Sequence, residues 1–254
     1  MLLLCLAAFL AGFVDSIAGG GGLIQVPALF VLLPPSIAAQ VPQVMGINKF
    51  SSICGTTVAT FQYARKVDLQ WRILIPMAMG AFIFSFLGAR TVSILNPKLI
   101  KPVILGLLVV VAVYTYTPKK TAPERALNVS PASRVLLAIC AGCAIGFYDG
   151  FFGPGTGTFL LIAFVGLFAL DFLHASAHAK VINLTTNIAA VAWFASTGNI
   201  PYRYAIPMAL ANIAGSLAGS HMAVLKGSEF VRKFFLGMVL ILIARFAYEM
   251  AVEK

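Results

Sequence analysis

Long apolar runs separated by short polar segments make up most of this 254-residue chain. The runs lack the two-residue alternation of barrel strands, and several approach the roughly 20 apolar residues that a membrane-spanning helix needs. Only helices and closed barrels can cross lipid, so the pattern predicts an all-helical membrane protein. Two of the runs end at Asp15 and Asp149. The other runs are expected at 23–33, 46–64, 73–95, 99–117, 157–170, 177–196, 204–225 and 230–250.

The order of these runs repeats once along the chain. Gly12-Phe13-Val14-Asp15 returns as Gly146-Phe147-Tyr148-Asp149, an offset of 134 residues (146 − 12 = 134). From Lys49 onward the offset is 131 residues (180 − 49 = 131). The positions that match at this second offset are Lys49 with Lys180, Arg72 with Arg203, Pro76 with Pro207, Gly88 with Gly219 and Gly106 with Gly237. Apolar composition alone does not align Asp, Lys, Arg and Pro in the same order, so we infer a duplication.

The duplication predicts the domain organisation. Residues 1–117 form an N-terminal membrane repeat, 118–132 a polar linker marked by prolines, and 133–254 a C-terminal membrane repeat. The apolar N-terminus matches an internal segment, so we expect it to belong to the fold and not to be a removable signal. The predicted fold class is all-α, a polytopic membrane protein of eight to ten helical segments in two pseudo-symmetric repeats with broken first helices. An odd number of crossings per repeat inverts the second repeat, whereas four crossings leave the repeats parallel. We favour inversion, which is common among secondary transporters.

The composition is that of a protein whose surface faces lipid. Hydrophobic residues make up 60% of the chain and charged residues 10%, against roughly 25% in ordinary soluble domains. Mean hydropathy is +0.95. The formal net charge of +10 comes mostly from basic residues between the apolar runs, such as Arg65, Lys66 and Arg72, as in cytoplasmic loops. We therefore expect the lipid bilayer as a partner and no nucleic acid.

Two glycine-rich breaks interrupt the apolar pattern. Gly19–Gly22 and, in the second half, Gly153-Pro154-Gly155-Thr156-Gly157 are poor helix interiors. We expect each break to unwind the chain at membrane depth and to expose N–H groups at the start of the next helix, where anions bind. Irregular backbone is tolerated there only beside protein or a watery cavity. The alternative is close helix packing through glycine, which we favour for the G-x-x-x-G pairs at 142/146 and 215/219.

Lys49 and Lys180 occupy equivalent positions, each near the start of a predicted segment and beside small polar residues. A single lysine there would snorkel to the interface. Two in matching polar surroundings predict an anion site, in which the ammonium groups attract the anion and hydroxyls, amides and loop N–H groups hold it. The predicted substrate-binding residues are Gly20, Gly21, Gly22, Asn48, Lys49, Ser51, Ser52, Thr56, Gly155, Thr156, Gly157, Thr158, Lys180, Asn183, Thr186 and Asn187.

Asp15 and Asp149 are the acids expected at membrane depth, where a carboxylate is costly and usually functional. One interpretation makes them coupling residues that carry protons. The other makes them partners in structural salt bridges or at the ends of the broken helices. The sequence leaves both interpretations open.

The cysteines and histidines are weaker candidates for chemistry. Cys140 and Cys143 form a C-x-x-C among small residues, where cysteine is usually a buried hydrophobe. His174 and His178 could share a helix face as metal ligands, but no glutamate completes a metalloprotease motif. No nucleotide-binding loop is present. We expect no catalytic residue, no metal and no cofactor.

Taken together, these motifs resemble the sulfite exporter TauE/SafE family of the sulfonate-uptake permease superfamily. The resemblance covers nearly the whole chain. It rests on G-F-V-D-S-I-A-G-G-G-G from residue 12, on G-F-Y-D-G-F-F-G-P-G-T-G from residue 146, and on N-K-F-S-S and A-K-V-I-N-L-T-T-N at the two lysines. It implies secondary transport of anions such as sulfite, sulfonates or sulfoacetate across a prokaryotic inner membrane. The chain departs from the family pattern before each lysine, where a small hydroxyl residue is often found, and this position bears on substrate choice.

The expected function is secondary transport of small anions by alternating access around a midplane site, coupled to an ion gradient. An anion channel of the same fold is the main alternative. An intramembrane metal-dependent enzyme at the two histidines is a weaker one. A homodimer is compatible with the sequence.

Overall fold

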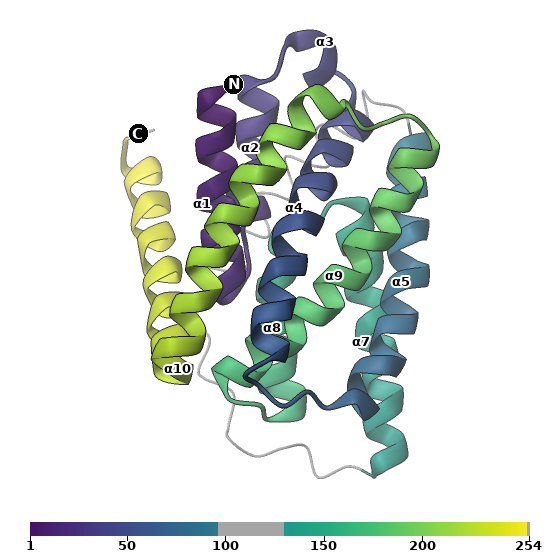
Figure 1. The fold of residues 1–254 in the computed structure, drawn as a ribbon, viewed down its shortest axis with the longest axis vertical. Helices are drawn as coiled ribbons and strands as arrows, with labels where there is room; N and C mark the ends of the chain where they lie inside the picture. The colour runs from purple at the N-terminus through teal and green to yellow at the C-terminus, as the bar shows by residue number, and fades with distance from the viewer. Residues whose placement is uncertain (96–129, 253–254) are drawn as a thin grey trace.

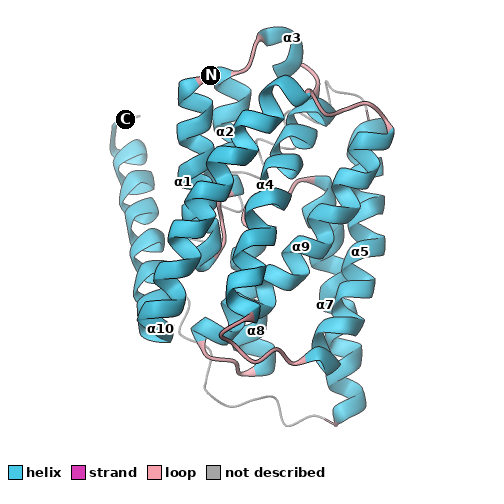
Figure 2. Ribbon diagram, in the orientation of Figure 1, coloured by secondary structure: helices cyan, strands magenta, loops and turns pink. Residues whose placement is uncertain are grey.

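The structure, a computed structural model, describes residues 1–95 and 130–252, with side chains described up to residue 234. All regular secondary structure in this part of the chain is helical (Figure 1; Figure 2), so the all-α prediction is confirmed. The predicted segment at 99–117 and nearly all of the predicted linker at 118–132 lie outside the described residues. The helices are α1 (Leu2–Ala18), α2 (Gly22–Leu32), α3 (Pro35–Ala38), α4 (Val41–Ala64), α5 (Trp71–Ile94), α7 (Pro131–Phe151), α8 (Thr156–Phe168), α9 (Phe172–Ser196) and α10 (Tyr202–Val252).

Local chemistry explains where several helices begin and end. The Ser130 hydroxyl accepts a hydrogen bond from the Ser133 N–H at 3.2 Å and caps α7. At the start of α9, Asp171 Oδ1 accepts hydrogen bonds from the two N–H groups of Leu173 and His174. Helix α10 is interrupted at Gly227 (φ 74°), where the chain turns back on itself in Figure 1. Its two stretches correspond to the segments predicted at 204–225 and 230–250.

Helix length separates the helices that can cross a membrane from those that are too short to do so. Helix α5, helix α7 and the Tyr202–Phe234 stretch of α10 are long and apolar enough to cross a membrane. Helices α4 and α9 have 24 and 25 residues, sufficient length, but they carry the polar residues around the two lysines. Helices α2 and α8 have only 11 and 13 residues. At 1.5 Å per residue these are about 17 and 20 Å long, well short of the roughly 30 Å hydrocarbon core.

Helices from the two parts of the chain pack against one another. Helix α5 packs mainly on α7, α1 packs mainly on α10, and α4 contacts both α9 and α10. Glycines allow the close approach. A Cβ on Gly146 would lie 2.6 Å from the Cα of Ala81, and one on Gly219 would overlap the carbonyl oxygen of Phe13. Close helix packing by the G-x-x-x-G pairs at 142/146 and 215/219 is therefore confirmed.

The directions of α1 and α7 bear on the predicted repeat. In Figure 1, α1 begins at the upper end of the molecule, beside the label N, and α7 begins at the lower end. Each ends at a glycine-rich break that leads into a short helix. Inverted repeats require such opposite directions, whereas parallel repeats would have α1 and α7 run the same way. We keep inversion as our interpretation of the duplication.

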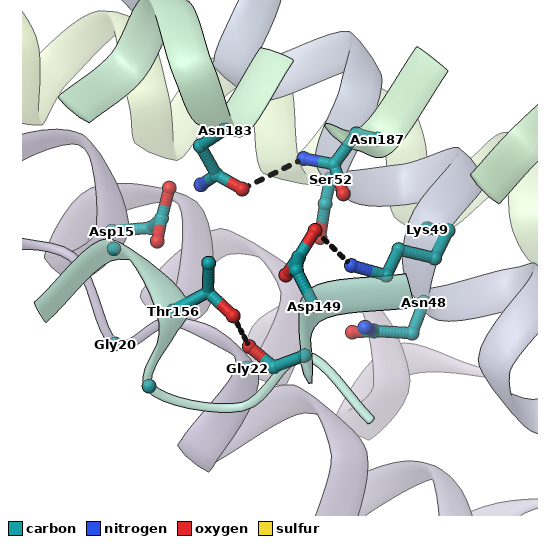
Figure 3. Close-up of a pocket in the computed structure, with 13 residues that line it drawn as sticks. Asp15, Gly20, Gly22, Asn48, Lys49, Ser52, Asp149, Thr156, Asn183 and Asn187 are labelled. Atoms are coloured by element: carbon teal, nitrogen blue, oxygen red, sulfur yellow. Dashed lines mark hydrogen bonds and ion pairs between the residues drawn. The ribbon is translucent and has the colours of Figure 1, made fainter. Parts of the chain in front are cut away.

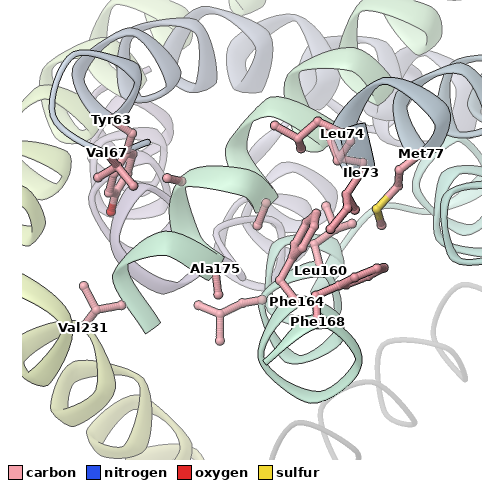
Figure 4. Packing of buried hydrophobic residues seen from close by; sticks show 14 of the residues in the cluster. Tyr63, Val67, Ile73, Leu74, Met77, Leu160, Phe164, Phe168, Ala175 and Val231 are labelled. Carbon is pink, nitrogen blue, oxygen red and sulfur yellow. The ribbon is translucent and has the colours of Figure 1, made fainter. Parts of the chain in front are cut away.

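Two apolar clusters lie on either side of a polar layer. The first contains Val44 from the start of α4 and Phe194 from the end of α9. The second, drawn in Figure 4, contains Tyr63 from the end of α4 together with Phe164 of α8. Helix α4 therefore contributes one end to each cluster, and its polar residues at 48–56 lie between them. This arrangement places the polar part of α4 at the level of the glycine-rich breaks.

Candidate functional site

A cavity lies where the two glycine-rich breaks meet the middle of α4 and α9 (Figure 3). Thirteen residues line it, and twelve of these are residues that the sequence predicts to bind substrate or to couple transport. The lining residues are Asp15, Gly20, Gly22, Asn48, Lys49, Ser52, Asp149, Gly153, Gly155, Thr156, Gly157, Asn183 and Asn187. The fold thus gathers around one space residues that come from both parts of the chain.

The two breaks touch each other beside this cavity. Gly19 and Gly153 have φ values of 80° and 92°, in the left-handed region that favours glycine. A Cβ on Gly157 would lie 2.7 Å from the Cα of Gly19, so a side chain at that position would not fit. Glycine is therefore required for both the backbone shape and the close approach of the breaks. Unwinding of the chain at both breaks, as predicted from the sequence, is observed.

The cavity faces the first turns of α2 and α8. The first N–H groups of a helix have no carbonyl partner within the helix and carry partial positive charge. Gly22 of α2 and both Thr156 and Gly157 of α8 line the cavity. The N–H of Gly21 donates to Asp15 Oδ1 at 3.4 Å, so the positive end of α2 already holds a carboxylate. This geometry is what an anion site at a helix terminus needs.

Each lysine forms an ion pair with the aspartate from the other part of the chain. Lys49 Nζ lies 2.6 Å from Asp149 Oδ2, and Lys180 Nζ lies 2.8 Å from Asp15 Oδ2. The side chains of the first pair are 3% and 2% exposed. In the second pair the lysine is 1% and the aspartate 20% exposed. Neither ammonium group snorkels to a surface.

The positions of the lysines within their helices correct one expectation. Lys49 and Lys180 are predicted near the starts of segments at 46–64 and 177–196. Helices α4 and α9 instead begin at Val41 and Phe172, five residues earlier in each case. Both lysines therefore lie about two turns inside their helices. The residues preceding them continue the same helical pattern, which is why the apolar runs alone placed the boundaries too late.

The pairing also changes the electrostatics expected for the site. The sequence predicts ammonium groups available to an anion, whereas two ammonium and two carboxylate groups formally cancel here. The salt-bridge interpretation of the aspartates is thus observed. Breaking a buried pair by removing one partner costs about 3–5 kcal/mol, because the remaining charge is left without compensation. An anion can contact Lys49 in this cavity only in competition with Asp149.

Amide side chains add neutral polar groups to the wall. The Asn187 Nδ2 donates to Asn183 Oδ1 at 3.2 Å. This bond occupies the Asn183 oxygen and leaves its Nδ2 directed toward Asp15 (Figure 3). Asn48 is 3% exposed, and its Oδ1 has no hydrogen-bond partner within the described part of the protein. Buried polar atoms are normally paired, so these amides suit a polar occupant.

Six predicted substrate-binding residues do not line the cavity, although all six are buried. They are Gly21, Ser51, Thr56, Thr158, Lys180 and Thr186. Neighbouring positions of a helix point about 100° apart, so Ser52 faces the cavity while Ser51 does not. The Thr186 hydroxyl donates to the carbonyl oxygen of Asn183 at 2.9 Å and is used within the helix. Lys180 contacts Asp15 from outside the cavity.

Gly153 is the lining residue that sequence reasoning left out. A Cβ at this position would lie 3.0 Å from Lys49 Nζ, so the backbone of the second break packs directly against the ammonium group. The signal was available, because Gly153 is the first residue of the second glycine-rich break, whose next glycines, Gly155 and Gly157, are predicted to bind.

The two histidines are both engaged in local contacts. His174 Nδ1 lies 2.5 Å from Asp171 Oδ2, and both side chains are partly exposed. His178 is fully buried: its Nε2 accepts from the Gln70 N–H at 2.9 Å, and its Nδ1 bonds the His174 carbonyl oxygen at 2.7 Å. Both ring nitrogens of His178 are thereby occupied, so the histidine pair does not offer a ready metal site.

Comparison with known proteins also indicates a membrane transporter. A family model described as sulfite exporter TauE/SafE matches residues 4–246. The chain is 34% identical over 230 residues to a probable membrane transporter protein, ORF9, of Sinorhizobium, covering 90% of this chain and 85% of the relative. It is 32% identical over 250 residues to a probable membrane transporter protein of Haemophilus influenzae, covering 98% and 94%. It is also 32% identical over 248 residues to the probable membrane transporter protein YfcA of Escherichia coli K12, covering 95% and 87%. No solved structure matches the chain.

Proposed function

This chain belongs to the sulfite exporter TauE/SafE family of membrane proteins, and we propose that it is a secondary active transporter of small sulfur-containing anions. Its substrates are inorganic or organic anions such as sulfite, sulfonates and sulfoacetate-like compounds. It carries them across the inner membrane of a prokaryotic cell by exposing the cavity alternately to each side, and an ion gradient drives the transport.

One observation carries this proposal: the ammonium group of buried Lys49 lies in a cavity bounded by two interrupted helices. Sulfite and sulfonate groups present several oxygens that accept hydrogen bonds. The ammonium group, the N–H group of Gly157 and the Asn183 amide offer donors around one small space, whereas the Thr156 N–H already donates to the carbonyl oxygen of Gly153. Charge-assisted hydrogen bonds to oxyanions are the strong ones.

The breaks and the ion pairs supply the elements for alternating access. The short helices α2 and α8 start at the point where Gly19 meets Gly157. The ion pairs join α4 to α7 and α9 to α1, so each one links the two parts of the chain. We assign the movement to rocking of these parts about the contact between the breaks, with opening and closing of the cavity on each side.

Uptake into proteoliposomes tests the proposed function. Purified protein is reconstituted and assayed with sulfite, methanesulfonate and sulfoacetate, and with acetate and phosphate for comparison. We expect saturable uptake of at least one sulfur anion, stimulated by the same anion inside the vesicle. Lys49→Gln should reduce this uptake about 10-fold or more, because a hydrogen bond to a charged group is worth roughly 1.5–3 kcal/mol.

Two further variants separate binding from folding. Lys66→Gln removes an exposed lysine from the α4–α5 connection and should transport normally. The double variant Lys49→Gln/Asp149→Asn leaves no unpaired charge, so it should fold and still fail to transport. Absence of saturable uptake for all three sulfur anions, or unchanged uptake by Lys49→Gln, would contradict the proposal. Uptake that internal substrate does not stimulate would favour a channel of the same fold.

A further inference from the structure

We propose that each monovalent anion crosses together with one proton carried by Asp149, so that transport is electroneutral. This inference rests on the proposed function and adds to it the coupling ion, the residue that carries it and the stoichiometry. It follows from the charges at the cavity and from the separate environments of the two aspartates.

The charges at the site are balanced before an anion enters. Lys49 and Asp149 form one pair, and Lys180 and Asp15 form the other. Helices α2 and α8 carry no ionisable side chain. The remaining ionisable groups on α7 and on the helices that pack against it are the exposed Arg72 and Arg90 of α5, Arg134, Cys140, Cys143 and Tyr148 of α7, and His174 and His178 of α9. Of these, Tyr148 donates its hydroxyl to the carbonyl oxygen of Pro154, and the histidines are held by Asp171 and Gln70.

An added anion would give this buried site one net negative charge. Separation of a charge from water is strongly unfavourable unless a partner compensates it. Lys49 supplies the ammonium group that lines the cavity, and this group is already paired with Asp149. When Lys49 turns to the anion, Asp149 loses its counter-charge. One proton taken up by Asp149 restores the balance.

The two aspartates differ in how well each would tolerate the loss of its ammonium partner. Asp15 is 20% exposed, and it accepts a hydrogen bond from the Gly21 N–H besides its contact with Lys180. Asp149 is 2% exposed, and within the described residues Lys49 is its sole ionic partner. A carboxylate left there without the ammonium group would be a buried charge with no compensation, and a bound proton removes that charge. Lys180 also does not line the cavity, so an anion in it reaches Lys49 and not Lys180. The geometry therefore assigns the proton to Asp149.

The test compares the effects of a pH gradient and of a membrane potential on methanesulfonate uptake, with sulfite measured in parallel. Methanesulfonate stays ionised, so its pH response reports on the protein. In the wild type, an external pH one unit lower than the internal pH should give about 10-fold accumulation, because one proton moves with each anion. An imposed potential of 100 mV, inside positive, should leave uptake unchanged.

The Asp149→Asn variant should show the opposite pattern. It carries the anion without a proton, so the pH gradient should have no effect. The same 100 mV should now produce about 50-fold accumulation, since one charge moving through 100 mV is worth about 2.3 kcal/mol. Asp68→Asn, which removes an exposed carboxylate, should behave as the wild type. Asp15→Asn should not acquire the response to potential.

The possible failures are distinguishable. Wild-type uptake that follows the potential and ignores the pH gradient would overturn electroneutral coupling, and this measurement needs no variant. A response to potential gained equally by Asp15→Asn and Asp149→Asn would overturn the assignment to Asp149. Absence of uptake for every sulfur anion tested would instead contradict the proposed function.

Discussion

The ion pair between Lys180 and Asp15 allows a prediction about stability with a definite order of effects. Lys180 is 1% exposed and has its charge neutralised by Asp15, which is itself 20% exposed and hydrogen-bonded to the Gly21 N–H. Asp15→Asn leaves a fully buried ammonium group without a counter-charge. Lys180→Met leaves a carboxylate that still has water and a backbone donor. Asp15→Asn should therefore destabilise the protein more than Lys180→Met.

The magnitude follows from the burial of each partner. Removal of one member of a buried ion pair costs about 3–5 kcal/mol, and we assign this full cost to Asp15→Asn. Each kcal/mol lowers the melting temperature of a chain of this size by about 2–4 °C. Asp15→Asn should lower it by about 6–20 °C, and Lys180→Met by about half as much. The double variant has no uncompensated charge and should recover most of the loss.

Thermal unfolding of detergent-purified protein measures these four melting temperatures, with tryptophan fluorescence as the signal. The double-mutant cycle isolates the interaction between the two side chains because both single variants share the same scaffold. A larger loss for Lys180→Met than for Asp15→Asn would contradict the reasoning from burial. A double variant as unstable as the sum of the two single variants would show that the pair does not interact as the structure places it.

Two further predictions concern the cavity wall. Gly153→Ala places a Cβ where φ is 92° and 3.0 Å from Lys49 Nζ, so it should destabilise the protein by about 1–3 kcal/mol and lower anion uptake about 10-fold or more. Gly198→Ala, at φ 69° with open space around it, is the matched control: it should show the backbone strain in its melting temperature while keeping its uptake, and equal loss of uptake in both variants would refute the role of Gly153. Asn187→Leu removes the donor that holds Asn183, so the KM for the anion should rise about 5- to 10-fold with little change in melting temperature. An unchanged KM would show that the Asn183 amide does not contact the anion.

The features of the fold that can be predicted from the sequence are those set by the local properties of the chain. Apolar runs predicted the helices, and the pattern of glycine and proline predicted both breaks. The break residues behave as expected because backbone freedom at Gly19 and Gly153 is a property of the residue itself. Helix boundaries were less accurate: α4 and α9 extend five residues further toward the N-terminus than their most apolar portions.

Only some of the residues that line the cavity could be predicted from the sequence, and the reason is geometric. Helical periodicity identifies residues that share a face, but the rotation of α4 and α9 against their neighbours depends on packing. Ser52 lines the cavity and Ser51 does not, although the two are adjacent and chemically identical. Gly153 lines it because the second break folds over the Lys49 ammonium group, a contact between residues far apart in the chain.

The sequence by itself determined that this protein is helical, that lipid is its solvent, and that its lysines, aspartates and glycine-rich breaks recur in matching order. These properties depend on composition and on neighbours along the chain. Only the tertiary structure decided which charges meet. Lys49 pairs with Asp149, 100 positions along the chain (149 − 49 = 100), and Lys180 pairs with Asp15, 165 positions away, because helix packing brings distant parts of the chain together. Electrostatic energy depends on distance in space, so the balance of charge at the cavity could not be read from the order of the residues.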